Sequence, residues 1–187
     1  MAEAIVIGVV TRTGSAVTVA LSGPADTPRF RARQEFGLTR PGLQAQPYHA
    51  AADLDLAAAA QLNGQVGRAA EEAAAAGLRS LADLLPATVG TEVAVVVKAV
   101  SVPDRLPDIL RSHAWMHAAE GVLYRQAVLA AAQECGWTPR AVERSSLPAA
   151  VPALAVLGRA AGRPWRQIEK DAARAALAIL AGTHTPR

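Results

Sequence analysis

Cysteine is almost absent from this chain of 187 residues, which contains Cys135 alone. A single cysteine excludes an intrachain disulfide and a cysteine-based zinc site, and it fits a reducing compartment. Cys135 closes an expected helix and precedes Gly136 and Trp137. Because no base lies beside it in the sequence, we expect a structural thiol and not a nucleophile.

Long apolar runs are also absent, and this bears on localisation. The run at residues 4–10 is too short for a signal peptide, and no basic region precedes it. No alanine-rich segment reaches the ~20 residues that span a bilayer. The charged residues that interrupt these segments are Glu71, Glu72, Arg125 and Arg174. We therefore expect a soluble, cytoplasmic protein with no membrane partner.

Aromatic residues make up only 4% of the chain, and no Gly-x-Gly run precedes an expected helix, so a glycine-rich phosphate loop is excluded. Much of the apolar content is alanine, which buries little surface. The core must therefore rest on closely packed helices and on strands of valine, leucine and isoleucine. The net charge of +3 and the pI near 9.6 point only weakly to a nucleic-acid partner.

Apolar periodicity predicts alternating strands and helices. Strands are expected at residues 4–10, 16–21, 30–36, 92–102 and 140–144, and helices at 50–76 with a second stretch to 85, 106–135, 147–162 and 165–180. The first two strands should form a hairpin, and the third should be an edge with Phe30, Ala32 and Phe36 on one face. Pro164 should occupy the first turn of the last helix.

This order predicts an α/β fold with one mixed five-stranded sheet. A three-stranded meander comes first and β-α-β-α follows, which places helices on both faces of the sheet. We expect a single domain at residues 1–182 and a C-terminal tail at 183–187.

The second half of the chain carries a family resemblance. The strand segment VAVVVKAV (93–100) is followed by AAEGVLYRQAVLAAAQECGW (118–137), AVERSSLP (141–148) and EKDAARAALAIL (169–180). This series resembles the ribonuclease H-like fold, and within it the Holliday-junction-resolvase branch. Asp171, ahead of an alanine run, is similar to the late metal-binding aspartate of those enzymes. The resemblance implies nuclease ancestry, a nucleic-acid partner and a divalent metal.

The chain departs from that family at the catalytic acids. Members of the family hold divalent metals with carboxylates, beginning with an aspartate on the first strand. Here that strand reads IVIGVVTRTG, with Val10 or a neighbour at the expected place, and the second buried strand offers Lys98 instead of an acid. Two-metal cleavage requires several carboxylates around ions ~3.5–4 Å apart. We therefore expect the usual site to be degenerate.

The densest cluster of reactive side chains lies on the expected helix 106–135. At about 100° per residue, His113, His117, Glu120 and Tyr124 share one stripe. The two imidazoles, one turn apart, and the Glu120 carboxylate can together bind one transition metal. Two other interpretations stay open. The four groups can form a hydrogen-bonded network within the packing, or they can belong to a solvated face.

Further candidates are expected where the parallel strands end. His49 and Asp53 can complete the histidine cluster as ligand-binding residues. Asp53 and Asp55 are, however, more typical of helix capping. Tyr124 and Arg125 are candidate ligand-binding residues on the long helix.

Two basic groups can hold phosphate. One is the edge formed by Arg29, Arg31 and Arg33, and the other consists of Arg159, Arg163 and Arg166 with Trp165. Charges on an edge strand more often prevent sheets from associating, and a lone tryptophan more often docks a helix.

Three functions fit these observations. The first, which we favour, is a nucleic-acid-associated protein of nuclease ancestry. If active, it would use a divalent metal (Mg²⁺, Mn²⁺ or Zn²⁺) held by a non-standard set of residues: Asp171, Glu120, His113 and His117. The second is a non-catalytic interaction domain whose helices pair with a partner or with a copy of itself. The third is a small-molecule enzyme in which the histidine cluster performs acid–base chemistry.

Overall fold

The computed structural model describes residues 3–86, 90–149 and 151–183, and it contains the expected mixed five-stranded sheet. The strand order is β3-β2-β1-β4-β5. β1 pairs antiparallel with β2 and parallel with β4, and β3 is the predicted edge. The strands are β1 (Ile5–Arg12), β2 (Ser15–Ser22), β3 (Arg29–Gly37), β4 (Thr91–Val97) and β5 (Thr138–Glu143).

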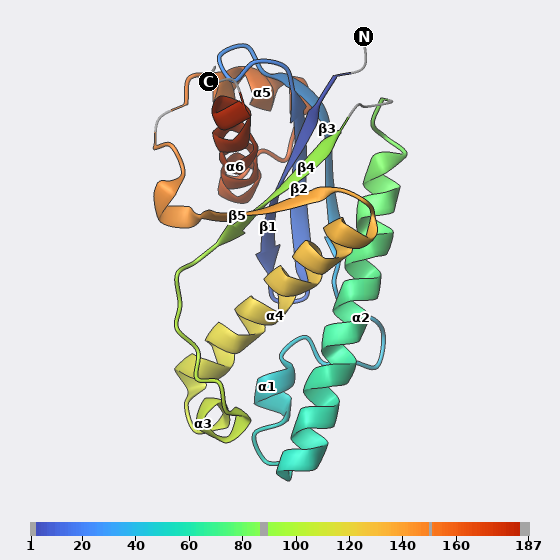
Figure 1. Ribbon diagram of the computed structural model, residues 1–187, viewed down its shortest axis with the longest axis vertical. Coiled ribbons are helices and arrows are strands. Elements are labelled where there is room, and N and C mark those ends of the chain that lie inside the picture. Colours follow the sequence, from blue (N-terminus) through green and yellow to red (C-terminus); the bar gives the residue numbers. More distant parts are fainter. Residues whose placement is uncertain (1–2, 87–89, 150, 184–187) are drawn as a thin grey trace.

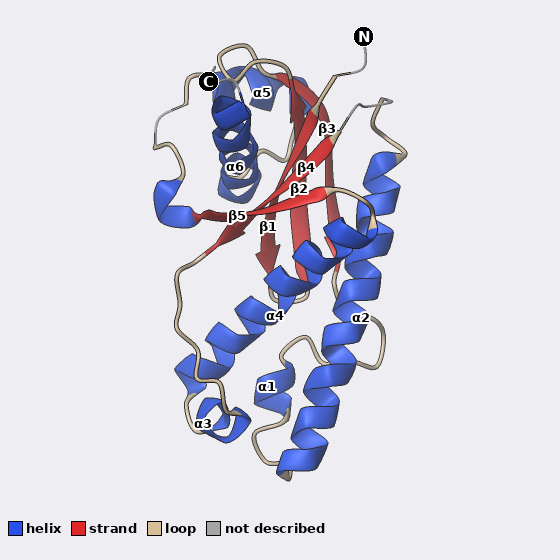
Figure 2. Cartoon of the chain, in the orientation of Figure 1, coloured by secondary structure: helices blue, strands red, loops and turns tan. Residues whose placement is uncertain are grey.

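Helices cover both faces of this sheet (Figures 1 and 2). One face packs against α2 and α4, and the other against α5 and α6. α2 and α4 run past the end of the sheet, and the short helices α1 and α3 lie beside their projecting ends. The bounds are α1 (Pro47–Ala50), α2 (Leu56–Ala82), α3 (Leu106–Leu110), α4 (His113–Glu134), α5 (Ala153–Ala161) and α6 (Gln167–Thr183).

Alternation along β1 divides the core into two clusters. Ile5, Ile7 and Val9 face α2 and α4, whereas Val6 and Val10 face α6. The expected dependence on alanine packing is confirmed, because α6 presents a fully buried face of small residues to the sheet: Ala172, Ala173, Ala175 and Ala176. The helix approaches so closely that a Cβ on Gly8 would lie 1.7 Å from the carbonyl oxygen of Ala172.

The prediction of one long helix at 106–135 is wrong at Ser112. This residue is extended (φ −132°, ψ 118°), and its hydroxyl accepts a hydrogen bond from the backbone N–H of Trp115 at 3.4 Å. A serine in this conformation is an N-cap, so it ends α3 and starts α4. His113 is therefore the first residue of α4 and does not lie in the middle of a continuous helix.

Several predicted boundaries also differ from the structure. β4 ends at Val97, so Lys98 lies beyond the strand and is exposed. The short helix α1 ends at Ala50, where a long helix was predicted to begin; a turn follows it, and α2 then runs as one continuous helix that starts at the Asp55 cap. Pro164 precedes α6, which begins only at Gln167.

The predicted single apolar face of β3 is interrupted. Ala32 and Phe36 pack in the cluster beneath α2, whereas Phe30 packs in the cluster beneath α6. The pairing register between β2 and β3 shifts at Ala20 and Leu21. A bulge of this kind adds one residue to a strand and reverses the faces that follow it.

Two further predictions, the C-terminal tail and the absence of a membrane-spanning helix, can be compared with the described residues only. α6 extends to Thr183, the first residue of the predicted tail, and residues 184–187 lie outside the described residues. None of the described helices is long and apolar enough to cross a membrane.

Candidate functional site

Three histidines gather where α1 meets the start of α4. His49 comes from α1, and His113 and His117 lie one turn apart on α4. The ring centroids are 4.8 Å apart for His49 and His113, 4.3 Å for His49 and His117, and 4.5 Å for the α4 pair. One ring nitrogen from each histidine lies within 4.8 Å of the other two. The structure thus brings together three histidines, including His49 from a distant segment.

Glu120 lies behind His49 and is 2% exposed. Its Oε1 lies 2.8 Å from His49 Nδ1 and accepts the His49 backbone N–H at 3.4 Å. Its Oε2 has no hydrogen-bond partner among the described residues, and it lies 3.6 Å from His117 Nδ1. The predicted metal-binding set was His113, His117 and Glu120. In the structure, His49 takes the third place beside the two histidines of α4, and Glu120 bonds to His49.

The buried Tyr124 does not join this cluster by a hydrogen bond. Its hydroxyl donates to the carbonyl of Ala45 at 2.7 Å, which anchors the loop before α1. Burial, together with the negative charge of Glu120, raises the pKa of Tyr124 to about 12. Arg125 is half-buried on the same helix, and burial lowers the pKa of its guanidinium.

Asp53 and Asp55, which follow His49 in the sequence, have different roles in the structure. Asp55 is the N-cap of α2, and its Oδ1 accepts the backbone N–H groups of Ala57 and Ala58, each at 2.9 Å. The capping interpretation of Asp55 is thus confirmed. Asp53 is exposed in the turn between α1 and α2, and it is absent from the grouped metal-ligating side chains among the described residues.

Asp171 lies on the other side of the sheet, in α6, and is 5% exposed. Its Oδ2 accepts from Arg144 at 2.8 Å, and its Oδ1 accepts from Arg174 at 3.0 Å and from Gln167 at 2.7 Å. The sheet separates it from α4, so the structure does not bring Asp171 together with Glu120 as the first functional hypothesis required.

A basic groove of about 820 Å³ runs between α5 and α6. It is lined by Arg159 and Arg163 from α5 and the turn after it, and by Lys170 and Arg174 from α6, with no carboxylate in its lining. Arg159, Arg163 and Lys170 form no ion pair within residues 3–86, 90–149 and 151–183. The groove borders Asp171, because two of its lining residues, Gln167 and Arg174, hold that carboxylate.

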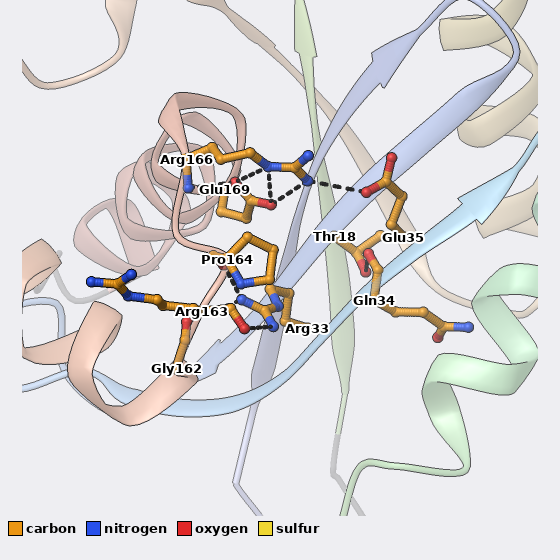
Figure 3. A network of polar contacts seen from close by, with 9 residues as sticks. All are labelled: Thr18, Arg33, Gln34, Glu35, Gly162, Arg163, Pro164, Arg166 and Glu169. Atoms are coloured by element: carbon orange, nitrogen blue, oxygen red, sulfur yellow. Dashed lines mark hydrogen bonds and ion pairs between the residues drawn. The ribbon is translucent and has the colours of Figure 1, made fainter.

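The predicted basic edge is largely used inside the fold. Arg29 and Arg31 bind Glu3, and hydrogen bonds from Arg29, Ser22 and Arg31 lower the pKa of that carboxyl to about 2. Arg33 donates to the backbone carbonyls of Arg163 and Gly162, each at 3.2 Å, and also to Pro164 (Figure 3). These arginines join β3 to the N-terminal segment and to the turn before α6.

The residues of the second predicted basic group, Arg159, Arg163 and Arg166 with Trp165, do not act together in the structure. Arg166 pairs with Glu169 at 2.7 Å and with Glu35 at 3.1 Å, as Figure 3 shows. Trp165 packs against Gly158, where an added Cβ would lie 2.6 Å from the indole ring. The tryptophan therefore docks α5, whereas Arg159 and Arg163 remain available in the groove.

Sequence reasoning missed the partners of Asp171. Asp171 follows Gln167 by four residues and precedes Arg174 by three. Both are spacings of neighbours on one helix face, so the sequence did hold a signal for these two contacts. The contact with Arg144 comes from the turn after β5 and depends on the tertiary structure. Lys170, which lines the groove, was also missed.

The sheet order, the parallel and antiparallel pairings and the helices on both faces together define a ribonuclease H-like fold. The chain is similar to Thermus thermophilus RuvC in complex with a Holliday junction substrate, at 17% identity over 98% of both chains and a TM-score of 0.56. A second structure of Thermus thermophilus RuvC matches at 16% identity, over 96% of this chain and 95% of that one, with a TM-score of 0.52. No family model and no curated protein matches the sequence. The predicted resemblance to resolvases is thus confirmed for the fold.

Proposed function

We propose that this protein binds nucleic acid through the groove between α5 and α6 and does not cleave it at the edge of the sheet. The observation that carries the proposal is the set of cations in that groove that form no ion pair with the residues that the structure describes. Arg159, Arg163 and Lys170 line one continuous depression without a carboxylate. A phosphate backbone that enters it would release counterions and meet no like charge.

Asp171 supports the second half of the proposal. Metal-dependent cleavage in this fold needs several carboxylates around the ions. Val10 lies near the end of β1, Lys98 follows β4, and Asp171 already accepts hydrogen bonds from three side chains. A pair of arginines 2.8 and 3.0 Å from the carboxylate occupies the positions that a cation would require. These residues do not fit a two-metal centre.

Branched DNA is the nucleic acid to test first. One of the RuvC structures that share this fold contains a Holliday junction substrate. The groove of this chain lies beside Asp171, the residue that resembles the late aspartate of the resolvases. A four-way junction and a linear duplex of the same sequence therefore make the most informative pair of probes.

Fluorescence anisotropy with these two probes tests the proposal. If three groove cations contact phosphates, affinity should fall roughly 40-fold between 50 and 200 mM salt. The double variant R159A/R163A leaves one such contact, so the same increase in salt should weaken its binding only about 3- to 4-fold. It should also bind more weakly than the unmodified protein at 50 mM salt.

The matched control is the double variant R68A/R105A. It also removes two positive charges, but from exposed residues on α2 and before α3. It should retain the affinity and the salt dependence of the unmodified protein. Equal losses in both double variants would mean that net charge alone drives binding. Binding that does not change with salt, or no binding to either probe, would contradict the proposal.

A further inference from the structure

We propose that His49, His113 and His117 form a binding site for one divalent transition-metal ion, with Zn²⁺ as the first candidate. The site lies on the projecting helical end of the molecule, on the opposite side of the sheet from α6 (Figure 1). It is independent of the nucleic-acid groove, and it rests on the positions of the three imidazoles, on Glu120, and on one unpartnered buried nitrogen.

The spacing of the imidazoles is close to that of a metal site. Tetrahedral zinc with Zn–N bonds of 2.0–2.1 Å places its ligand nitrogens about 3.3 Å apart. Here the candidate nitrogens lie within 4.8 Å of one another. His117 has a side chain that is 48% exposed, and His113 is exposed as well, so small rotations about their side-chain bonds can close the difference.

Glu120 fixes which nitrogen of His49 is available. The carboxylate lies 2.8 Å from Nδ1, so Nδ1 carries the proton and donates to it. The other nitrogen, Nε2, is buried and has no hydrogen-bond partner within the part of the chain that the structure describes. A metal-binding histidine usually donates its other ring N–H to a carboxylate in this way. A metal ion would satisfy the orphaned nitrogen.

The donor set selects the class of ion. Imidazole nitrogens suit zinc, cobalt, nickel and copper, whereas magnesium and calcium prefer oxygen ligands. One buried carboxylate oxygen beside the rings, Glu120 Oε2, has no hydrogen-bond partner among the described residues, and it lies 3.6 Å from His117 Nδ1. Three histidine ligands leave the fourth tetrahedral position open toward the solvent beside His113 and His117, which is the arrangement of catalytic zinc sites.

Metal binding would also hold the short α1 against α4. α1 is one turn long, and it contacts α4 through the bonds of Glu120 with His49 and through the packing of Tyr48 near Met116 and Ala119. An ion bound to residues of both helices binds the folded state only, so it should raise the melting temperature.

Isothermal titration of the untagged, chelator-treated full chain with Zn²⁺ tests the proposal, and Co²⁺ serves as the spectroscopic probe. We expect one ion per chain, a visible absorption band of tetrahedral Co²⁺, and a melting temperature raised by roughly 5–10 °C at one hundred times the Kd. His113→Ala and His117→Ala remove exposed side chains, so both variants should fold and lose the Co²⁺ band.

Two further variants separate a metal site from a packed polar network. Glu120→Gln keeps the shape of the side chain but removes its charge, and it should weaken Zn²⁺ binding roughly 10- to 100-fold. His184→Ala removes the fourth histidine of the chain and should leave binding unchanged, because the proposed set does not include it. No binding by the unmodified protein, or equal binding by His117→Ala, would overturn the proposal.

Discussion

Replacing Gly8 with alanine is expected to lower the free energy of unfolding by about 3 kcal/mol or more, because the new methyl group has no space. A Cβ at this position would lie 1.7 Å from the carbonyl oxygen and 2.6 Å from the carbonyl carbon of Ala172. These are backbone atoms of α6, which cannot rotate away as a side chain would. β1 and α6 must separate, and the melting temperature should fall by roughly 6–12 °C in a chain of this length.

Gly67→Ala is the matched control for this prediction. Gly67 lies inside α2, and a Cβ there would meet nothing within 4 Å. Alanine should therefore stabilise the protein by about 0.5–1 kcal/mol, since glycine weakens a helix interior. If thermal or chemical denaturation showed the two variants to be equally stable, the close approach of α6 to β1 would be refuted.

Replacing Asp171 with alanine is expected to cost about 3–5 kcal/mol, which is the usual effect of removing one partner from a buried ion pair. The carboxylate is 8% exposed at its side chain, and Arg174, its partner, is 18% exposed. Without Asp171, the Arg174 guanidinium keeps its hydrogen bond to the carbonyl of Ala149. Its Nε has no partner among the described residues. Chemical denaturation of the purified variant measures this loss.

Two comparisons identify the cause of that loss. Asp171→Asn keeps an oxygen that can accept from Gln167 but removes the charge, so its destabilisation should be smaller. Glu72→Ala breaks an exposed pair with Arg40 and should change stability by less than about 1 kcal/mol. A metal-binding acid kept for chemistry would behave differently. Its removal would leave the unfolding free energy unchanged or would raise it.

The fold could be predicted in outline because the strongest signals in the sequence are local. The apolar runs that became β1 and β4 identify strands buried on both faces, and the alternation of β3 identifies an edge. The break at Ser112 was missed, since one capping serine within an otherwise helical pattern is a weak signal. The register shift between β2 and β3 depends on pairing between strands, which periodicity in one strand does not report.

The candidate site was only partly predictable for the same physical reason. The spacing of His113 and His117 on one helix face can be read directly from the sequence. The sequence offered both His49 and Asp53 as residues that can complete the cluster. That His49 lies there, and that Glu120 contacts it, depends on the docking of α1 against α4. The contact between Arg144 and Asp171 likewise joins a turn after β5 to α6. Pairs made across the tertiary structure leave no periodic trace in the sequence.

One measurement tests most directly the central claim that this protein binds nucleic acid in the groove between α5 and α6 and does not cleave it with a bound metal. A labelled four-way junction is incubated with excess protein in Mg²⁺ or Mn²⁺, and binding and strand integrity are followed in the same sample. We predict that the junction is bound in a salt-dependent manner and remains intact. Metal-dependent cleavage that Asp171→Asn abolishes would contradict the account.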